Sequence, residues 1–193
     1  METKSIMIVG VGGQGTLLAS RLLGSVLLSQ GFDVKVSEVH GMSQRGGSVV
    51  TYVKYGDKVY SPIVDKGEAD VIISFERLEA ARYLPYLKKG GKIITSTQKI
   101  DPMPVITGAA SYPEDILKKI EDKGVSVTAV DALELAEQAG TSKASNVVLM
   151  GVVSKLTDFD IDAWHKAIVE CVPPKFLELN KKAFELGRQA VKD

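Results

Sequence analysis

The sequence predicts an α/β fold, a three-layer α/β/α sandwich around a Rossmann-like, mostly parallel sheet. Segments with strand and helix patterns alternate along the 193 residues, and such alternation is typical of a parallel sheet with helices on both faces. A glycine-rich turn joins the first predicted strand directly to the first predicted helix, as in folds that bind ligands at this point. The length is that of one domain, and we expect a single domain over residues 1–193.

The first half of the chain alternates regularly. Apolar or alternating runs with many β-branched residues predict strands, and apolar residues three or four positions apart predict helices. We expect strands at residues 5–9, 33–39, 48–55, 70–75 and 92–96, and helices at 15–30 and 76–87, the second interrupted near Pro85 and ended by Gly90-Gly91.

A turn sequence is expected to give the sheet an antiparallel edge. Gly56-Asp57-Lys58 separates the β-prone residues 48–55 from Val59-Tyr60. Short glycine-containing turns between such runs are typical of β-hairpins. We therefore predict a β-hairpin edge at this position.

The second half continues the alternation. Residues 98–112 are rich in proline and predict a loop with one short strand near Val105. Ser111 and Glu114 have the spacing of a capping box, which predicts the start of a helix that ends at Gly124. Beyond it we expect a strand at 125–130, helices at 131–139, 145–156 and 161–170, and a C-terminal helix at 174–191.

Composition excludes several classes of function. The 24 basic and 24 acidic residues give no net charge, so neither nucleic acid nor a membrane surface is expected as a partner. A single cysteine cannot form a disulfide framework or hold an iron–sulfur cluster, and this favours a cytoplasmic setting. Two histidines 125 positions apart give no metal-binding spacing, and no apolar run reaches the ~20 residues of a membrane span.

The glycine-rich turn is the strongest functional signal. Three of its glycines fit the pattern G-x-G-x-x-G, a fourth is additional, and a helix follows at once. Such a turn needs close backbone approach or positive φ, and the helix that it opens presents N–H groups to an anion. We therefore expect an anionic ligand to contact Gly10, Gly12, Gly13, Gln14, Gly15 and Thr16.

A second glycine-containing loop follows the second predicted strand. Because carboxyl ends of parallel strands share one edge of a sheet, this loop is expected beside the glycine-rich turn. Arginine offers a planar fork suited to phosphate or carboxylate. The candidate ligand-binding residues here are Ser43, Gln44, Arg45, Gly46 and Gly47; the alternative is a surface turn with a solvated arginine.

No catalytic set is recognisable. Glu38 lies near the position of a ribose-binding acid, although a glutamate at a strand end is common. His40 has the chemistry for proton transfer, but a lone loop histidine is more often structural. The sequence contains neither a P-loop nor a G-x-S-x-G elbow. We therefore predict a binding surface, with no catalytic and no metal-binding residue in this chain.

The two glycine segments together resemble a known family. Gly10-Val-Gly-Gly-Gln-Gly15 and Glu38-Val-His-Gly-Met-Ser-Gln-Arg-Gly-Gly47 are similar to the gamma-type domain of the 2-oxoacid:ferredoxin oxidoreductases, and the resemblance extends over nearly the whole chain. It implies a subunit of a complex that oxidatively decarboxylates a 2-oxoacid, of the aryl pyruvate class, to an acyl-coenzyme A and reduces ferredoxin.

The resemblance also implies partners. Thiamine diphosphate and the iron–sulfur clusters are expected in a larger alpha subunit, ferredoxin is reached through the complex, and coenzyme A is a possible ligand of this chain. Two other interpretations remain open. In the first interpretation, the chain is a stand-alone reductase that binds NAD or FAD, and Glu38 binds a ribose of the dinucleotide. In the second, the chain is a structural adaptor. The strongly apolar helix at 145–156 favours a partner or self-association surface, or close helix packing through Asn146 and Gly151.

Overall fold

A computed structural model describes residues 2–38 and 46–191. Its centre is a six-stranded sheet with the order β2-β3-β1-β4-β5-β6. Neighbouring strands among β1, β4, β5 and β6 pair in parallel, whereas β3 is antiparallel to both β1 and β2. The strands are β1 (Lys4–Val11), β2 (Asp33–Glu38), β3 (Ser48–Gly56), β4 (Ala69–Ser74), β5 (Leu87–Ser96) and β6 (Ser126–Val130).

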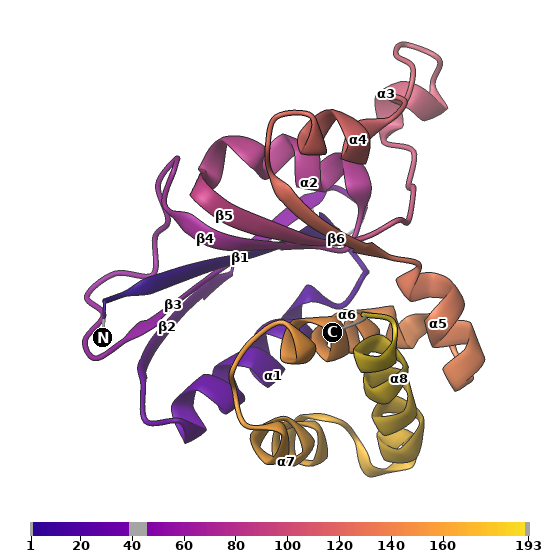
Figure 1. Ribbon diagram of the computed structural model, residues 1–193. Helices are drawn as coiled ribbons and strands as arrows, with labels where there is room; N and C mark the ends of the chain where they lie inside the picture. The colour runs from indigo at the N-terminus through magenta and orange to yellow at the C-terminus, as the bar shows by residue number, and fades with distance from the viewer. Residues whose placement is uncertain (1, 39–45, 192–193) are drawn as a thin grey trace.

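Helices cover both faces of this sheet, as Figure 1 shows. One face carries α1 (Thr16–Ser29), α5 (Ala132–Ala139), α6 (Ser145–Lys155), α7 (Ile161–Cys171) and α8 (Leu177–Gln189), and the other carries α2 (Arg77–Tyr83) and α4 (Ile116–Glu121). A short helix, α3 (Met103–Ile106), projects away from the body. The predicted three-layer α/β/α sandwich is therefore confirmed.

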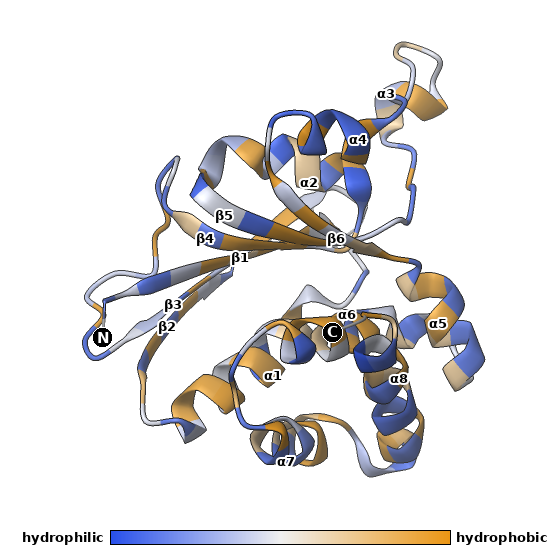
Figure 2. Cartoon of the chain, in the orientation of Figure 1, coloured by the Kyte–Doolittle hydropathy of each residue, from blue (hydrophilic) through white to orange (hydrophobic). Residues whose placement is uncertain are grey.

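Alternate side chains of β1 contribute to two apolar cores, one on each face of the sheet. Ile6 and Ile8 pack with α1, α6 and α8 on one face of the sheet. Met7 and Val9 pack with α2 and α4 on the other. All four side chains are buried, because successive side chains of a strand point to opposite faces and both faces of this strand are covered. Apolar residues accordingly dominate the central strands in Figure 2.

The antiparallel edge exists, but the predicted hairpin that should form it is wrong. Residues 57–60 form no strand, and the edge consists of β2 paired with β3. Both sides of β3 are occupied, by β2 and by β1, so Val59-Tyr60 finds no free edge to pair with. The backbone N–H of Val59 instead donates to the Asp33 carboxylate, at 2.9 Å.

Gly90-Gly91 does not end a helix but lies within β5. The predicted interruption near Pro85 is confirmed, since α2 gives way there to a 3₁₀ turn over Leu84–Tyr86. The glycines follow the strand's first residues, where the register with β4 shifts. A Cβ on Gly91 would lie 2.9 Å from the carbonyl oxygen of Asp70, so the two strands approach too closely there for a side chain.

Two other local predictions are also wrong. The segment near Val105 is the short helix α3 rather than a strand. The capping box at Ser111 and Glu114 does not form, because α4 begins later, after Asp115, whose φ is 53°. The first error lies in the projecting helix α3, none of whose residues is buried, so no packing against the sheet favours a strand there.

The apolar helix predicted at 145–156 is α6, and its apolar surface is used within the chain. Its residues from Asn146 to Ser154 are buried. Close contact with α8 depends on two glycines, Gly151 and Gly187, whose added Cβ atoms would lie 2.1 and 2.0 Å from carbonyl oxygens of the facing helix. The expected packing role of Gly151 is confirmed, and α6 offers no self-association surface.

The C-terminal segment also differs in detail from the prediction. Pro174–Phe176 form a 3₁₀ turn, and the α-helix proper starts at Leu177. Its buried residues are Asn180, Ala183, Phe184 and Gly187.

Candidate functional site

The glycine-rich turn follows β1 at the point where the helical connections change sides. The helix α1 leads from β1 along one face of the sheet, whereas α2 leads from β4 along the other. In open α/β sheets such a switch point is where ligands bind. The backbone φ is 103° at Gly13 and 82° at Gly15, which directly precedes α1, so two positions of the turn have the left-handed conformation that favours glycine.

The second glycine segment lies directly beside this turn. The backbone N–H of Gly12 donates to the carbonyl of Gly47 at 2.8 Å, and Val11 pairs with Ser48. Because β3 runs antiparallel to β1, the start of β3 meets the end of β1. Gly46 and Gly47 are thus brought to the same edge as Gly12–Gly15, whereas Ser43, Gln44, Arg45 and His40 lie outside the described residues.

The side chain of Gln14 is engaged inside the chain. Its Oε1 accepts a hydrogen bond from the backbone N–H of Val11 at 2.7 Å, and its Nε2 donates to the Phe75 carbonyl and to Oε1 of Gln98, each at 2.9 Å. Gln14 therefore links the ends of β1, β4 and β5 and holds the turn in place. This geometry gives Gln14 a positioning role, and its contact with a ligand stays a prediction.

Asn146, at the start of α6, contacts the glycine-rich turn. Its Nδ2 donates to the carbonyl of Gly15 at 3.1 Å, and a Cβ on Gly15 would lie 2.4 Å from that same nitrogen. The sequence suggested helix packing for Asn146, but the residue in fact joins the start of α6 to the glycine turn.

The first turn of α1 directly follows the glycine-rich turn at the carboxyl edge of the sheet. Among the described residues no side chain caps its N-terminus, and no acidic side chain lies in its first turn. Its leading N–H groups have no acceptor within the helix, and they carry the positive end of the helix dipole.

Two hollows flank the glycine turn. The first, here named the Glu38 hollow, has a volume of about 270 Å³ and includes Gly13, Thr16, Glu38 and Thr51 in its lining. The second, the Lys143 hollow, has about 340 Å³ and is lined by Gly13, Gln14, Gly15, Gln98, Leu133, Ser142, Lys143 and Ser145. Glu38 accepts a hydrogen bond from the Ser20 hydroxyl at 2.8 Å, which keeps its carboxylate at the wall of the first hollow.

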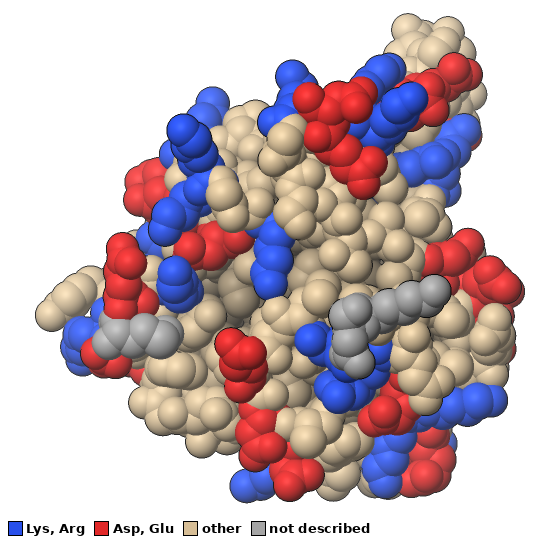
Figure 3. Space-filling view, viewed as in Figure 1, with Lys and Arg blue, Asp and Glu red and all other residues tan. Residues whose placement is uncertain are grey.

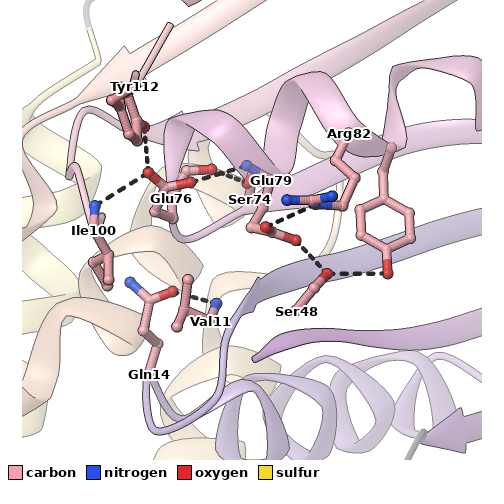
Figure 4. Close-up of polar contacts among 10 residues, drawn as sticks. Val11, Gln14, Ser48, Ser74, Glu76, Glu79, Arg82, Ile100 and Tyr112 are labelled. Atoms are coloured by element: carbon pink, nitrogen blue, oxygen red, sulfur yellow. Dashed lines mark hydrogen bonds and ion pairs between the residues drawn. The ribbon is translucent and has the colours of Figure 1, made fainter. Parts of the chain in front are cut away.

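A buried acidic network behind the turn was not predicted (Figure 4). Glu76 is 1% exposed and accepts hydrogen bonds from the backbone N–H groups of Glu79 and Ile100, at 2.9 and 3.2 Å, and from the Tyr112 hydroxyl. Burial, with a smaller contribution from Glu76, raises the pKa of Tyr112, so its hydroxyl stays protonated and donates. The network ties the segment that carries Gln98 to the start of α2.

Glu79 extends this network to β3. It accepts hydrogen bonds from the Ser48 hydroxyl and, at 3.0 Å, from Nε of Arg82. The one sequence signal for this network is a pair of glutamates three positions apart directly after a buried strand, a pattern that is common at the N-termini of helices.

The described residues hold no cluster of histidine, cysteine or acidic side chains suited to a metal ion. None of the helices in residues 2–38 and 46–191 combines the length and apolarity that crossing a membrane requires. Basic and acidic side chains are mixed over the face of the molecule drawn in Figure 3.

Comparisons with known proteins agree with this architecture. The sequence model of the pyruvate ferredoxin/flavodoxin oxidoreductase family matches residues 5–190. The indolepyruvate oxidoreductase subunit IorB of Thermococcus kodakarensis is 48% identical over 198 aligned residues, which cover 100% of this chain and 98% of the relative.

Two solved structures share the fold. The pyruvate oxidoreductase subunit PORC of Thermotoga maritima has a TM-score of 0.75 at 20% identity, over 100% of this chain and 98% of its own. The 2-oxoglutarate:ferredoxin oxidoreductase of Magnetococcus marinus, solved with 2-oxoglutarate, coenzyme A and succinyl-CoA bound, has a TM-score of 0.76 at 18% identity. The match covers 98% of this chain and 31% of that longer one.

The fold and these matches define the class of protein, an α/β subunit of an oxidoreductase complex that acts on 2-oxoacids. The chain belongs to the pyruvate ferredoxin/flavodoxin oxidoreductase family. Within it, the chain is a small subunit of a 2-oxoacid:ferredoxin oxidoreductase, and the resemblance seen in the two glycine motifs is confirmed.

Proposed function

We propose that this chain is the non-thiamine subunit of an indolepyruvate ferredoxin oxidoreductase and that its glycine-lined edge binds the anionic part of coenzyme A. In the proposed reaction the 2-oxoacid loses its carboxylate as carbon dioxide. The remaining acyl group passes to the thiol of coenzyme A, and the two electrons released reduce ferredoxin. The choice of indolepyruvate is supported by the name of the relative that is 48% identical over the full chain.

Thiamine diphosphate and the iron–sulfur clusters are assigned to a larger alpha subunit. Clusters of this kind are held by about four cysteine thiolates, whereas this chain has only Cys171. The residues of this chain therefore do not fit an iron–sulfur cluster. We propose a cytoplasmic complex in which this chain supplies part of the acyl-acceptor site.

One observation carries the coenzyme A proposal, namely the 2.8 Å hydrogen bond that joins Gly12 to Gly47. It makes one continuous surface from the two glycine segments at the N-terminus of α1. A Cβ on Gly13 would meet no atom of the described chain within 4 Å, so the space above this residue is available to a ligand. The Magnetococcus enzyme of the same fold has been solved with coenzyme A bound.

The first test is Gly13→Ala in the reconstituted complex. The new methyl group would point into the proposed ligand space, so we expect KM for coenzyme A to rise about tenfold, equivalent to about 1.4 kcal/mol, with assembly unchanged. Gly31→Ala is a matched control, because Gly31 also has positive φ (84°) and open space around its Cβ but lies at the far end of α1. If both variants change KM equally, backbone strain is the cause and the ligand site is wrong.

Arg45→Ala tests the part of the proposal outside the described residues. A direct contact with phosphate contributes about 1.5–3 kcal/mol, so we expect a higher KM for coenzyme A from this variant. An unchanged KM would remove Arg45 from the site.

The second test asks whether the chain acts within a complex. We expect it to co-purify with a larger, brown, thiamine-containing protein when both are produced together, and to show no 2-oxoacid oxidation alone. Calorimetry of the isolated chain with NAD, FAD and coenzyme A checks the alternatives. Tight binding of NAD or FAD would favour a stand-alone reductase and contradict the proposal. A structural adaptor would tolerate Gly13→Ala without loss of function.

A further inference from the structure

The two hollows beside the glycine turn differ in charge. The Glu38 hollow contains a carboxylate held at its wall by Ser20. Lys143, an exposed residue, is among those that line the Lys143 hollow, and none of the described residues in this lining is acidic. Gly13 and Gly15 line both hollows, so a ligand seated on the turn can extend to either side, and the difference in charge decides which side receives its anionic group.

We propose that the Lys143 hollow is the phosphate subsite of this edge, with Lys143 as the residue that recognises the phosphate. The inference rests on the proposed function, which places a coenzyme A-like ligand on the turn, and it adds the side of the turn and a residue that the sequence did not single out. Lysine is a common phosphate-binding residue because its ammonium group acts as a compact positive charge with three donors.

The other lining residues suit the same guest. Ser142 and Ser145 flank Lys143, and their hydroxyls can donate to phosphate oxygens. Gln98 is fixed by its hydrogen bond from Gln14 at 2.9 Å, so this wall of the hollow is held by the turn itself. The volume of about 340 Å³ falls within the range of about 300–1,000 Å³ that is usual for small-molecule sites.

Among the described residues that line the Glu38 hollow, Glu38 carries the only charge, and this carboxylate disfavours a phosphate beside it. A carboxylate repels a phosphate most strongly where solvent is partly excluded, because the effective dielectric constant is lower there than in water. Its lining by Val49 and Val50 together with Thr51 suits an uncharged part of the ligand that carries hydroxyl or amide groups.

The experiment compares Lys143→Ala, Lys143→Arg and Lys118→Ala in the reconstituted complex, with coenzyme A and with pantetheine, which has the thiol but no phosphate. Lys118 is an exposed lysine on α4, in the opposite helical layer, and serves as the control. We expect Lys143→Ala to raise KM for coenzyme A about tenfold with little change in kcat, since a charged hydrogen bond is lost. Lys143→Arg should retain most of the affinity, and Lys118→Ala should behave as wild type.

Pantetheine separates recognition of phosphate from a structural effect. If Lys143 contacts phosphate, its removal leaves the KM for pantetheine unchanged. If pantetheine is not turned over, the inhibition constant for pantetheine is measured instead and should also stay unchanged. Equal losses with both compounds, or no loss with coenzyme A, overturn the inference. If Gly13→Ala weakens coenzyme A binding while Lys143→Ala does not, the phosphate subsite is wrong and the proposed function stands; if neither variant weakens it, both fail.

Discussion

Gly187→Ala is expected to lower the free energy of unfolding by about 3 kcal/mol, at the upper end of the cost of overpacking. A Cβ at this position would lie 2.0 Å from the carbonyl oxygen of Val148 on α6. That oxygen belongs to a buried helix and cannot rotate away as a flexible side chain would. The helices α6 and α8 would have to separate, and the apolar contacts around Trp164 and Phe184 would loosen with them.

Urea unfolding followed by circular dichroism measures this effect. Gly24→Ala in α1 is the matched control, because Gly24 is also a buried helical glycine but an added Cβ would meet nothing within 4 Å. Since alanine is the better helix former, this control should gain about 0.5–1 kcal/mol. Equal stability of the Gly187→Ala and Gly24→Ala proteins would show that the contact between α6 and α8 is looser than described.

Glu76→Ala is the second substitution with a large expected effect, a loss of about 3 kcal/mol or more. The change leaves the backbone N–H groups of Glu79 and Ile100 without their acceptor and removes the partner of the Tyr112 hydroxyl. Each buried group left unsatisfied costs about 1–3 kcal/mol, and loss of the helix cap on α2 is included in that sum.

Tyr112→Phe is the graded control for this network. It removes one donor and leaves Glu76 with both backbone N–H groups, so we expect a loss of only about 1 kcal/mol. Both variants are compared by urea unfolding at pH 7. If Tyr112→Phe costs as much as Glu76→Ala, the tyrosine rather than the carboxylate organises this end of the sheet.

The order of strands and helices could be read from the sequence because its signals are local. Apolar runs such as residues 70–75 predict buried strands from their own composition, and β4 forms there. The segment at 145–156, which is apolar almost all round, likewise predicts a helix covered on both faces, and α6 is buried from Asn146 to Ser154. The glycine motif and the loop from Glu38 to Gly47 indicated the family for the same reason, since each motif is contiguous.

In two of the wrong predictions, a partner distant in sequence decided the outcome. Val59-Tyr60 has strand-forming residues, but β1 and β2 already occupy both sides of β3. Gly90-Gly91 looks like a helix end, yet the approach of the Asp70 carbonyl places the pair inside a strand.

The candidate site depends both on local sequence motifs and on the tertiary structure. The sequence by itself determined the α/β fold, the glycine turn at the start of a helix, and the family, because spacing within a short segment fixes these features. Only the tertiary structure decided that Gly47 lies against Gly12, that Gln14 bonds to the Phe75 carbonyl, and that Lys143, more than a hundred positions from the turn, lines a hollow beside it. Hydrogen bonds and electrostatic contacts between such distant segments form only when the fold brings the segments together. A local sequence pattern therefore cannot predict them.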